Sequence, residues 1–466
     1  MLRPSMSEPS WKARGYCPGV WTPMPSGDGW IVRVRPHHAR MTAAHLTALG
    51  RLARSCGNGI IELTRRGNLQ IRGVSQGSWP RLRDELVELG IAGGAPESDA
   101  HPPLFVCPLS GLDPRCPELE PLADALDRML ADRVLTTPEM QRRLPDKFSI
   151  VLGGGSRSSS ELGADIHVRL HPDHPHVADL AVAGRFDEAT QLGSIDVASA
   201  ADAVRRLLIA LDVFPSERRR MRDAVAADVA QLRQAIAPLD GGAPRRAASW
   251  GSAEVGYHTG SVDWFGYALP FGSASAEAWG ALARIAERFG SGEVRFTPTR
   301  HVLVVGVRPD DRAALVEFGQ RRSFGVRRPV RALELVACSG SPACGSAHGE
   351  TRDLARRLGR LLHRSDRPQA TLHVSGCEKS CARDEAADIT LVHAADGMRL
   401  GFGRDVRETL ASPPLSLDGV RRLLIERFVP AAPSQLQKAQ LQKAQLQRAQ
   451  LQMAARGSAA AGESER

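Results

Sequence analysis

The sequence has 466 residues, of which 42% are hydrophobic and 24% are charged. A chain of this length is too long to form a single compact core, so we expect two or more domains. The composition is that of a globular protein rather than a disordered chain. The formal net charge of +9 predicts an anionic partner such as a nucleic acid, a phosphate ligand or a polycarboxylate. Aromatic residues make up only 5%, which argues against nucleic-acid binding by base stacking.

Targeting and membrane segments are not evident in the sequence. The N-terminal residues lack an apolar core of signal-peptide length, and apolar runs such as 302–307 are too short to cross a bilayer. We therefore expect a cytoplasmic protein without a membrane partner. Cytosolic thiols stay reduced, so the eight cysteines favour metal binding over a disulfide framework.

The chain contains an internal repeat. An offset of 233 residues aligns Gly57 with Gly290, and an offset of 234 aligns Trp30 with Trp264. Each copy has an apolar run, a helical stretch, a glycine stop and two short runs joined by a turn, in the same order. This order predicts a β-α-β-β half of a ferredoxin-like unit, and we interpret the repeat as a duplication.

In the first copy we predict a strand at 30–34, then a helix, then a hairpin of strands 60–64 and 69–72. The helix is indicated by apolar residues spaced for one face: Leu46, Leu49, Leu52 and Ala53. The second copy starts with an apolar run at 264–269. Two such halves could pair into one pseudo-symmetric sheet, which would place the other segments on either side of a shared axis and a site between the halves.

The predicted fold class is α+β, with five segments along the chain. They are a first ferredoxin-like half-domain (15–94), an α/β domain (95–240), a second half-domain (250–325), a second α/β domain (326–430) and a tail (431–466). The tail repeats every five residues from Gln435, a period that builds no sustained apolar helix face.

Four cysteines fall within 44 residues as C-x5-C and C-x3-C: Cys338, Cys344, Cys377 and Cys381. A short strand is predicted just before each pair, at 333–337 and 371–374, with an amphipathic helix between them. Strand, helix, strand is a βαβ unit, which makes the strands parallel and brings their carboxyl ends to one edge. We therefore expect all four thiolates to converge.

Four soft thiolates suit either a tetrahedral zinc ion or an iron-sulfur cluster. Paired ligands of structural zinc sites usually have two to four residues between them, and the first pair here has five. The surrounding loops are rich in glycine and serine, which leaves room for a bulky cluster and backbone N–H groups for its sulfurs. These features favour an iron-sulfur cluster over zinc.

This cysteine pattern, at the end of a duplicated chain, resembles that of the sulfite and nitrite reductase family over nearly all of residues 15–430. The resemblance implies two reductase-type α/β domains beside the half-domains, related by a pseudo-two-fold axis, and a [4Fe-4S] cluster held by the four cysteines. Residues 64–70 look like the Thr-x-Arg-x-x-x-Gln segment of the family. That match implies that Arg66 contacts an anion or a macrocycle.

Two departures from the reductase pattern concern cations. The family has a Leu-Pro-x-Lys-x-Lys segment, and here Lys147 is kept whereas Ser149 replaces the second lysine. An arginine expected before Cys107 is also missing from residues 101–104. Their loss would weaken binding of a small oxyanion. Residues 17–19, 23–29 and 108–114 instead look like signatures of the precorrin-3B synthases, a branch that acts in aerobic cobalamin biosynthesis.

This resemblance implies a monooxygenase that hydroxylates precorrin-3A at C20 with O2 and closes a lactone, giving precorrin-3B. It also implies a mononuclear non-haem iron, whose ligands the sequence does not assign. Arg66, Arg72 and Lys147 are expected to pair with carboxylates of the macrocycle. No G-x-G-x-x-G follows a predicted strand, so we expect a separate NADH-dependent reductase to deliver electrons.

Two alternatives stay open. One is a sulfite or nitrite reductase that binds sirohaem, which Ser149 disfavours. The other is a nucleic-acid-binding protein with a structural four-cysteine metal, suggested by arginine-rich stretches at 218–222 and 321–331. Most such charge runs are solvated faces, so we expect no nucleic-acid partner.

Overall fold

The computed structural model describes residues 17–96, 103–131, 144, 148–211, 220–237, 254–327, 332–362 and 369–428. The predicted tail at 431–466 and Lys147 lie outside these residues. None of the described helices is both long and apolar enough to cross a membrane. We name four units by their residues: the first half-domain (17–96), the middle domain (103–237), the second half-domain (254–327) and the cysteine domain (332–428).

The two half-domains have the same order of elements. The first consists of β1 (Met24–Ser26), β2 (Gly29–Val34), η1 (His37–Ala39), β3 (Arg40–Thr42), α1 (Ala43–Cys56), β4 (Ile60–Leu63), β5 (Leu69–Val74) and α2 (Trp79–Glu88). The second consists of β11 (Gly256–His258), β12 (Trp264–Ala268), η6 (Pro270–Gly272), β13 (Ser273–Ser275), α8 (Ala276–Phe289), β14 (Glu293–Phe296), β15 (His301–Val305) and α9 (Arg312–Arg321). The predicted helix, glycine stop and hairpin of the first copy are thus confirmed.

The half-domains exchange one short strand each. The two sheets run β1-β2-β5-β4-β13 and β11-β12-β15-β14-β3, so β13 completes the first sheet and β3 completes the second. Equivalent hydrogen bonds accompany the exchange on both sides. Ala276 N donates to Gly59 O, and Ala43 N donates to Gly292 O, both at 2.8 Å. The expectation of one shared sheet is therefore wrong. The exchanged strands have only three residues each, too few to show a pattern in the sequence.

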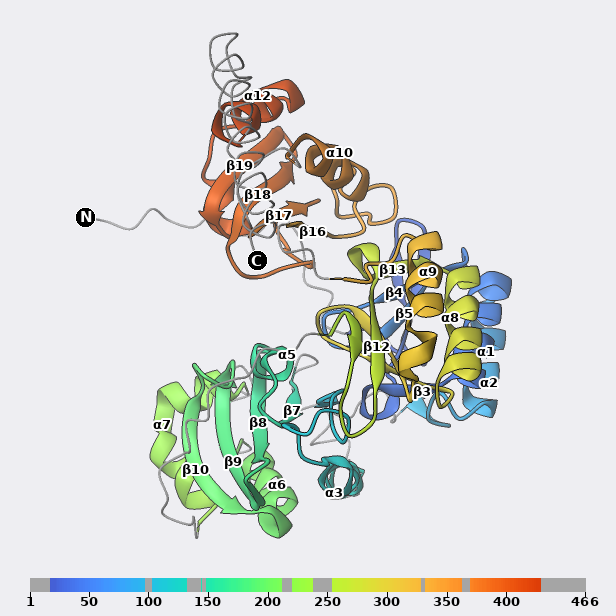
Figure 1. Cartoon of the computed structure of the whole chain (residues 1–466). Helices are drawn as coiled ribbons and strands as arrows, with labels where there is room; N and C mark the ends of the chain where they lie inside the picture. The colour runs from blue at the N-terminus through green and yellow to red at the C-terminus, as the bar shows by residue number, and fades with distance from the viewer. Residues whose placement is uncertain are drawn as a thin grey trace, which may run out of the picture.

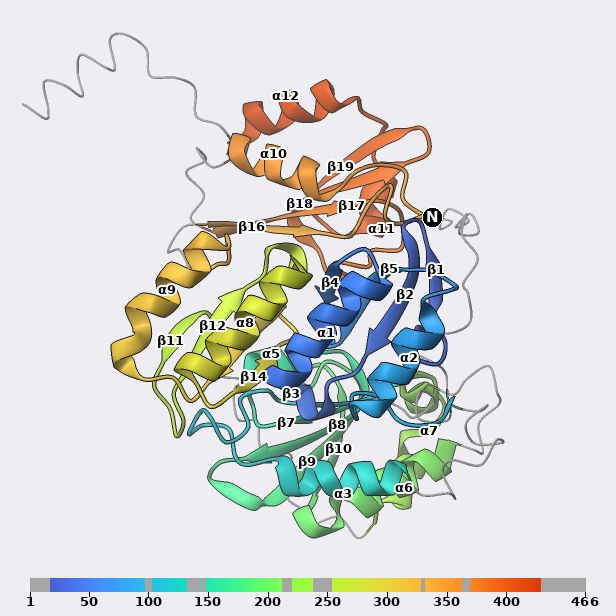
Figure 2. The ribbon, with the colours of Figure 1, turned by 90° about the vertical axis from the view of Figure 1, so that its right-hand side faces the viewer.

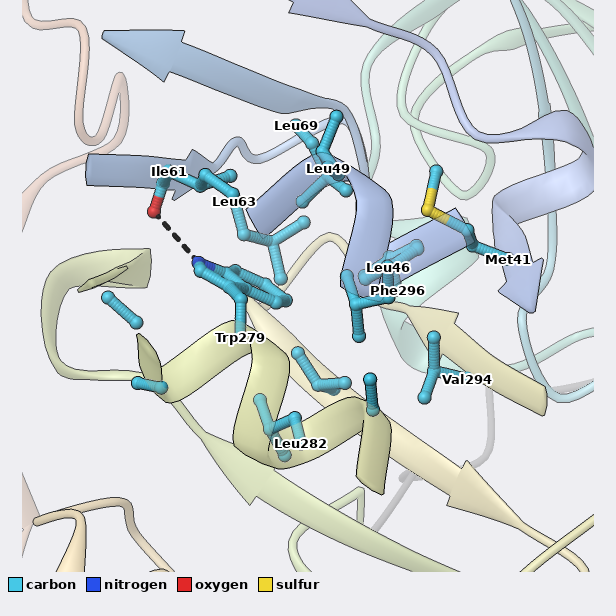
Figure 3. Close-up of a cluster of buried hydrophobic side chains, with 14 of the residues drawn as sticks. Met41, Leu46, Leu49, Ile61, Leu63, Leu69, Trp279, Leu282, Val294 and Phe296 are labelled. Atoms are coloured by element: carbon cyan, nitrogen blue, oxygen red, sulfur yellow. Dashed lines mark hydrogen bonds between the residues drawn. The ribbon is translucent and has the colours of Figure 1, made fainter. Parts of the chain in front are cut away.

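One hydrophobic core lies between the two half-domains. Helices α1 and α8 pack side by side on the same face of the paired sheets (Figure 2). Thr42 and Ser275 cap them in equivalent positions by accepting hydrogen bonds from His45 N and Ala278 N. Trp279 of α8 is fully buried against residues of both copies, and its Nε1 donates to Ile61 O at 3.2 Å (Figure 3).

The middle and cysteine domains each contain a mixed sheet with helices. The middle domain consists of β6 (Leu104–Val106), α3 (Glu120–Leu130), β7 (Ile150–Gly153), α5 (Arg157–Ser160), β8 (Ala164–His171), β9 (His174–Gly184), β10 (Thr190–Asp196), α6 (Ala200–Ala210) and α7 (Met221–Ala235). The cysteine domain consists of β16 (Ala332–Ala337), α10 (Arg352–Leu362), β17 (Gln369–Ser375), β18 (Ala387–Ala394), β19 (Gly397–Arg404), α11 (Val406–Leu410) and α12 (Leu417–Phe428).

These two sheets share a strand pattern. In both, the first three strands are parallel and the fourth is antiparallel: β6-β7-β8-β9 in one and β16-β17-β18-β19 in the other. Figure 1 shows the cysteine domain and the middle domain at opposite ends, with the half-domains beside them. The α+β class and the duplicated half-domains are thus as predicted.

Candidate functional site

The four cysteines lie at the carboxyl ends of two adjacent parallel strands. β16 ends at Ala337 directly before Cys338, and its neighbour β17 ends at Ser375, two residues before Cys377. The thiols are close enough to influence one another. Burial, followed by the charges of Cys338, Cys377 and Cys344, raises the pKa of Cys381 to about 11. The two cysteine pairs therefore converge in the structure, as the sequence predicted.

The four thiols are not gathered in the structure as the ligands of a single metal ion would be. Four sulfurs around a tetrahedral zinc, at about 2.3 Å each, would lie about 3.8 Å apart. Among the described residues, the one group of three or more ligand atoms within 4.8 Å of one another is His37, His38 and Asp124, and no three of the cysteines meet this limit. The preference for an iron-sulfur cluster therefore rests on the five residues between the first two cysteines and on the groups around the sulfurs.

Backbone and hydroxyl groups surround the sulfurs. Gly376 N donates to Cys338 Sγ at 3.2 Å, and a side chain at Gly376 would press on Ala347 and Cys338. Thr351 Oγ1 donates to Cys338 O at 2.6 Å, which ties the start of α10 to the loop. Backbone N–H groups that donate hydrogen bonds to the cysteine sulfurs are typical of iron-sulfur sites. The donor set therefore fits a [4Fe-4S] cluster bound by four thiolates.

The first cysteine loop (residues 338–344) is held by the hairpin turn between β1 and β2. The carbonyl oxygen of Ala343 accepts hydrogen bonds from Ser26 Oγ at 2.8 Å, Gly27 N at 3.2 Å and Arg72 Nη2 at 2.6 Å. A Cβ at Gly27 would overlap the carbonyl oxygen of Pro342, so only glycine fits. This contact gives a structural reason for Ser26 and Gly27 in the segment 23–29, which the sequence showed only as part of a signature.

Arg72 has a different role from the predicted contact with substrate. Its Nε and Nη2 form a two-pronged pair with Asp28 at 2.9 and 2.8 Å, and Nη1 donates to Glu62 at 3.2 Å and to Ser339 at 3.3 Å. With the bond to Ala343, every donor of this buried guanidinium is taken within the protein. We therefore assign Arg72 to support of the first cysteine loop.

Glu62 links the same loop to α10. Its carboxylate accepts from Ser339 Oγ at 3.1 Å and from Arg352 at 2.6 Å, in addition to Arg72. Burial alone would raise the pKa of Glu62, but Arg352 and Arg72 outweigh burial and hold that pKa below its usual range. The residue is ionised at neutral pH and completes a buried network of two arginines and two carboxylates.

The second cysteine loop (residues 377–385) is held by three other units. Arg300 of the second half-domain donates to Ala382 O at 3.1 Å. Arg65 of the first half-domain pairs with Glu385 at 2.9 Å and also with Asp384, and Arg185 of the middle domain pairs with Glu385. The loop that carries Cys377 and Cys381 is therefore the point where all four units meet.

Arg66 lies in a group of basic side chains next to this junction. It is exposed, and among the described residues it has no ion-pair partner; its Nη2 donates to Gly163 O at 3.3 Å. Its side chain is nevertheless surrounded by neighbouring groups, and this partial desolvation, followed by the charge of Arg220, lowers the pKa of Arg66; Arg33, which shares a hydrogen bond with Cys17, is also a neighbour. The contact of Arg66 with an anion remains a prediction. Lys147, predicted beside it, lies outside the described residues.

His373 was not predicted as a site residue. It lies on β17 four residues before Cys377, is fully buried, and neither ring nitrogen has a hydrogen-bond partner in the described part of the chain. Burial, followed by Arg383, Arg300 and Arg65, lowers the pKa of His373 to about 4. The imidazole is therefore neutral at pH 7. In the sequence it stands in a short apolar run and looks like any strand residue.

The group of His37, His38 and Asp124 lies where η1 meets α3. His38 is buried, and its two ring nitrogens contact Glu120 at 3.0 Å and Asp127 at 2.8 Å. Burial alone would lower the pKa of His38, but these two carboxylates raise it above its usual value. His37 also pairs with Asp127, and Arg40 with Glu120. His38 therefore connects the first half-domain to the middle domain, and these contacts favour its protonated form.

We expect His38→Gln to destabilise the protein more at pH 6 than at pH 9. The folded-state pKa is raised, so the ion-pair contribution is complete below the unfolded pKa of about 6.5 and is lost as pH rises through the folded pKa. The difference in unfolding free energy at pH 6 should be about 1 kcal/mol, measured by urea titration. His176→Gln, on an exposed part of β9, is the control. An effect of His38→Gln that does not change with pH would contradict this assignment.

Comparison with known proteins agrees with this geometry. The chain is 32% identical over 395 residues to a precorrin-3B synthase from Sinorhizobium sp, an alignment that covers 83% of this chain and 82% of that protein. The chain belongs to the precorrin-3B synthases of the nitrite and sulfite reductase family. The family domain described as the nitrite/sulfite reductase ferredoxin-like half domain matches residues 22–89 and 258–318, one in each half-domain.

Reductases of this family are also similar. A ferredoxin–nitrite reductase from Synechococcus elongatus is 26% identical over 452 residues, covering 88% of each chain. The solved structure of the Mycobacterium tuberculosis NirA protein superposes with a TM-score of 0.64 over 81% of this chain and 76% of that one, at 21% identity. The structural match shows a shared fold, and the relatives of this family are enzymes.

Proposed function

We propose that this protein acts in cobalamin biosynthesis and converts precorrin-3A to precorrin-3B, by O2-dependent hydroxylation at C20 with closure of a lactone. The similarity to a precorrin-3B synthase over most of both chains carries the proposal. Ser149, in place of a lysine expected of the reductases, points the same way, because a reductase uses that charge to bind a small oxyanion, and an enzyme whose substrate is the macrocycle itself binds no such oxyanion.

A bound [4Fe-4S] cluster would supply electrons one at a time. The protein would hold it through Cys338, Cys344, Cys377 and Cys381, on loops fixed by the half-domains and the middle domain. Arg66 would bind a carboxylate of the macrocycle, since its guanidinium is exposed and has no acidic partner among the described residues. Electrons from NADH would come through a separate reductase.

The mononuclear iron expected for this reaction has no assigned ligands. Two histidines and a carboxylate are a common set for non-haem iron, and His37, His38 and Asp124 are such a set in the described residues. However, both nitrogens of His38 are already engaged by Glu120 and Asp127. This group does not fit a bound iron, and we derive no step through it.

An absorption spectrum of the anaerobically purified protein, followed by turnover, tests the function. We expect a broad brown shoulder without a Soret band, and a product of precorrin-3A that contains one oxygen atom from ¹⁸O2. A strong Soret band with a red charge-transfer band would instead indicate a sirohaem reductase. A colourless protein with bound zinc, or a product without added oxygen, would also overturn the proposal.

Arg66→Gln is expected to weaken binding of precorrin-3A by about 10- to 100-fold, because one charge-assisted hydrogen bond to a carboxylate is lost. The effect should fall on KM more than on kcat, as Arg66 is proposed to bind the substrate and not to react. Arg54→Gln, an exposed residue of α1 that pairs with Glu277, is the matched control. Unchanged binding by Arg66→Gln would remove this residue from the substrate site.

A further inference from the structure

The middle domain contains a loop in the same structural position as the first cysteine loop. Cys107 directly follows β6, as Cys338 directly follows β16, and both strands are the first of a parallel set. Cys107 N donates to Leu152 O at 2.9 Å, which joins the loop to the end of β7. We name residues 107–116 the middle-domain loop. It begins and ends with a cysteine.

The half-domains hold the two loops through corresponding parts of the repeat. Gly27 N, in the turn between β1 and β2, contacts the first cysteine loop, and Gly260, in the corresponding turn between β11 and β12, lies so close to Leu112 O of the middle-domain loop that a Cβ would overlap it. Glu62 binds the first cysteine loop through Ser339, and Arg295, 233 residues later in the repeat, donates to Pro108 O at 3.0 Å and Ser110 O at 2.6 Å. The two loops are therefore related by the pseudo-symmetry.

The middle-domain loop carries two thiols, and hydroxyl groups lie beside them. Cys107 and Cys116 are buried, with relative exposures of 1% and 3%, and their sulfurs lie 3.8 Å apart. Ser156, after β7, contacts Cys107 Sγ at 3.1 Å and Ser159 Oγ at 2.9 Å. A Cβ at Gly154 would overlap Cys116 Sγ, so Gly154 packs directly against this thiol.

We propose that Cys107 and Cys116 are a redox-active dithiol that hydrogen peroxide oxidises to a disulfide. Cys107 attacks the peroxide O–O bond, which gives a sulfenic acid at Cys107 and water. The sulfur of Cys116 then attacks this sulfenic acid, the S–S bond forms, and a second water leaves. Two thiols and one peroxide thus give one disulfide and two waters. A small-molecule dithiol reverses the reaction.

Three observations favour this pair over ordinary buried cysteines. The sulfurs are in van der Waals contact, so a disulfide needs side-chain rotation and only a small backbone movement. The hydrogen bond from Cys116 lowers the pKa of Cys107 to about 7; burial opposes this shift and the hydrogen bond of Ser156 adds to it. A substantial fraction of Cys107 is then the thiolate, which is the form that attacks a peroxide. Both thiols are buried, so we assign a small peroxide as the oxidant rather than a bulky one.

Oxidation would change a loop that connects two units. Ser261 N of the second half-domain donates to Leu112 O at 2.7 Å, midway between the cysteines, and Arg295 binds the same loop. Shortening the distance between Cys107 and Cys116 therefore pulls on the contact of the middle domain with the second half-domain. The proposal concerns the dithiol alone and does not depend on the reaction proposed above.

Peptide mass after peroxide treatment tests the proposal. The full-length protein is reduced, freed of reductant, treated with hydrogen peroxide, denatured in N-ethylmaleimide and digested with trypsin, which cleaves after Arg115 between the two cysteines. We expect the two peptides to be joined, with the mass of two hydrogens lost, and to separate after dithiothreitol. Recovery of Cys107 and Cys116 as alkylated thiols, like the buried control Cys56, would overturn the proposal.

Single variants identify the order of attack. Cys116→Ser should lose the cross-link and accumulate a Cys107 adduct of dimedone, a reagent for sulfenic acid, whereas Cys107→Ser should give no adduct at Cys116. The unfolding midpoint of each variant shows whether it is folded. A dimedone adduct at Cys116 in folded Cys107→Ser, or a cross-link of Cys107 to another cysteine in the wild type, would contradict the assigned chemistry.

Discussion

Cys344→Ala is expected to give a colourless and inactive protein. Each of the four cysteines would bind one iron, and the other cysteine of the first cysteine loop, Cys338, is itself one of these ligands and cannot replace Cys344. We expect the wild type to contain about four iron atoms and four sulfide ions per chain, and the variant to contain less than about one of each. Iron and sulfide analysis after anaerobic purification measures this loss.

Cys56→Ala is the control for that experiment. Cys56 is buried and lies at the end of α1 beside Ser55 and Ser78, within the first half-domain and away from the cysteine loops. This variant should retain the brown absorption and the iron content of the wild type. A Cys344→Ala protein with full iron and sulfide would show that the cluster has other ligands, whereas stoichiometric zinc in the wild type would show that the site is structural.

Arg72→Met should lower the free energy of unfolding by about 3 to 5 kcal/mol and reduce the cluster content. The substitution keeps much of the side-chain volume but leaves Asp28 without its two-pronged partner and Glu62 with Arg352 alone. Removing one member of a buried ion-pair network is costly, because the remaining charge stays buried. The first cysteine loop also loses a donor to Ala343 O. Urea titration and iron analysis measure the two effects.

The matched control is Arg205→Met on α6. Arg205 forms an exposed pair with Asp202 within one helix, and such pairs contribute little. We expect an unchanged unfolding midpoint and full cluster content. If Arg72→Met had the same small effect, or if it impaired only substrate binding, Arg72 would be a substrate contact as the sequence suggested and not a support of the loop.

The duplicated half-domains and the convergent cysteines were predictable because each has a local signal. Helix periodicity, glycine stops and the spacing of four cysteines are read within short windows, and a βαβ unit has one favoured geometry. Arg66 was predicted by a motif, and the structure places it with an exposed guanidinium. That Arg66 and Lys147 bind the substrate stays a prediction.

The contacts between units could not be predicted in this way. Arg72 stands in a strand beside a motif arginine, and only the fold reveals that Asp28 and Ala343 use all of its donors. Glu385 and Arg185 are 200 residues apart and look like ordinary surface charges in the sequence. The exchange of β3 and β13 was missed for the same reason, since a three-residue strand has no pattern of its own.

The strand exchange affects how the chain can fold during synthesis. The outer edge of β4 has no partner until β13 has been made, about 210 residues later. At about 5 to 20 residues per second, translation takes roughly 10 to 40 seconds to reach that point. Throughout this delay an apolar sheet edge is open to pairing with other nascent chains. The first half-domain is therefore expected to need a chaperone on the ribosome, and to aggregate when expressed without residues 273–275.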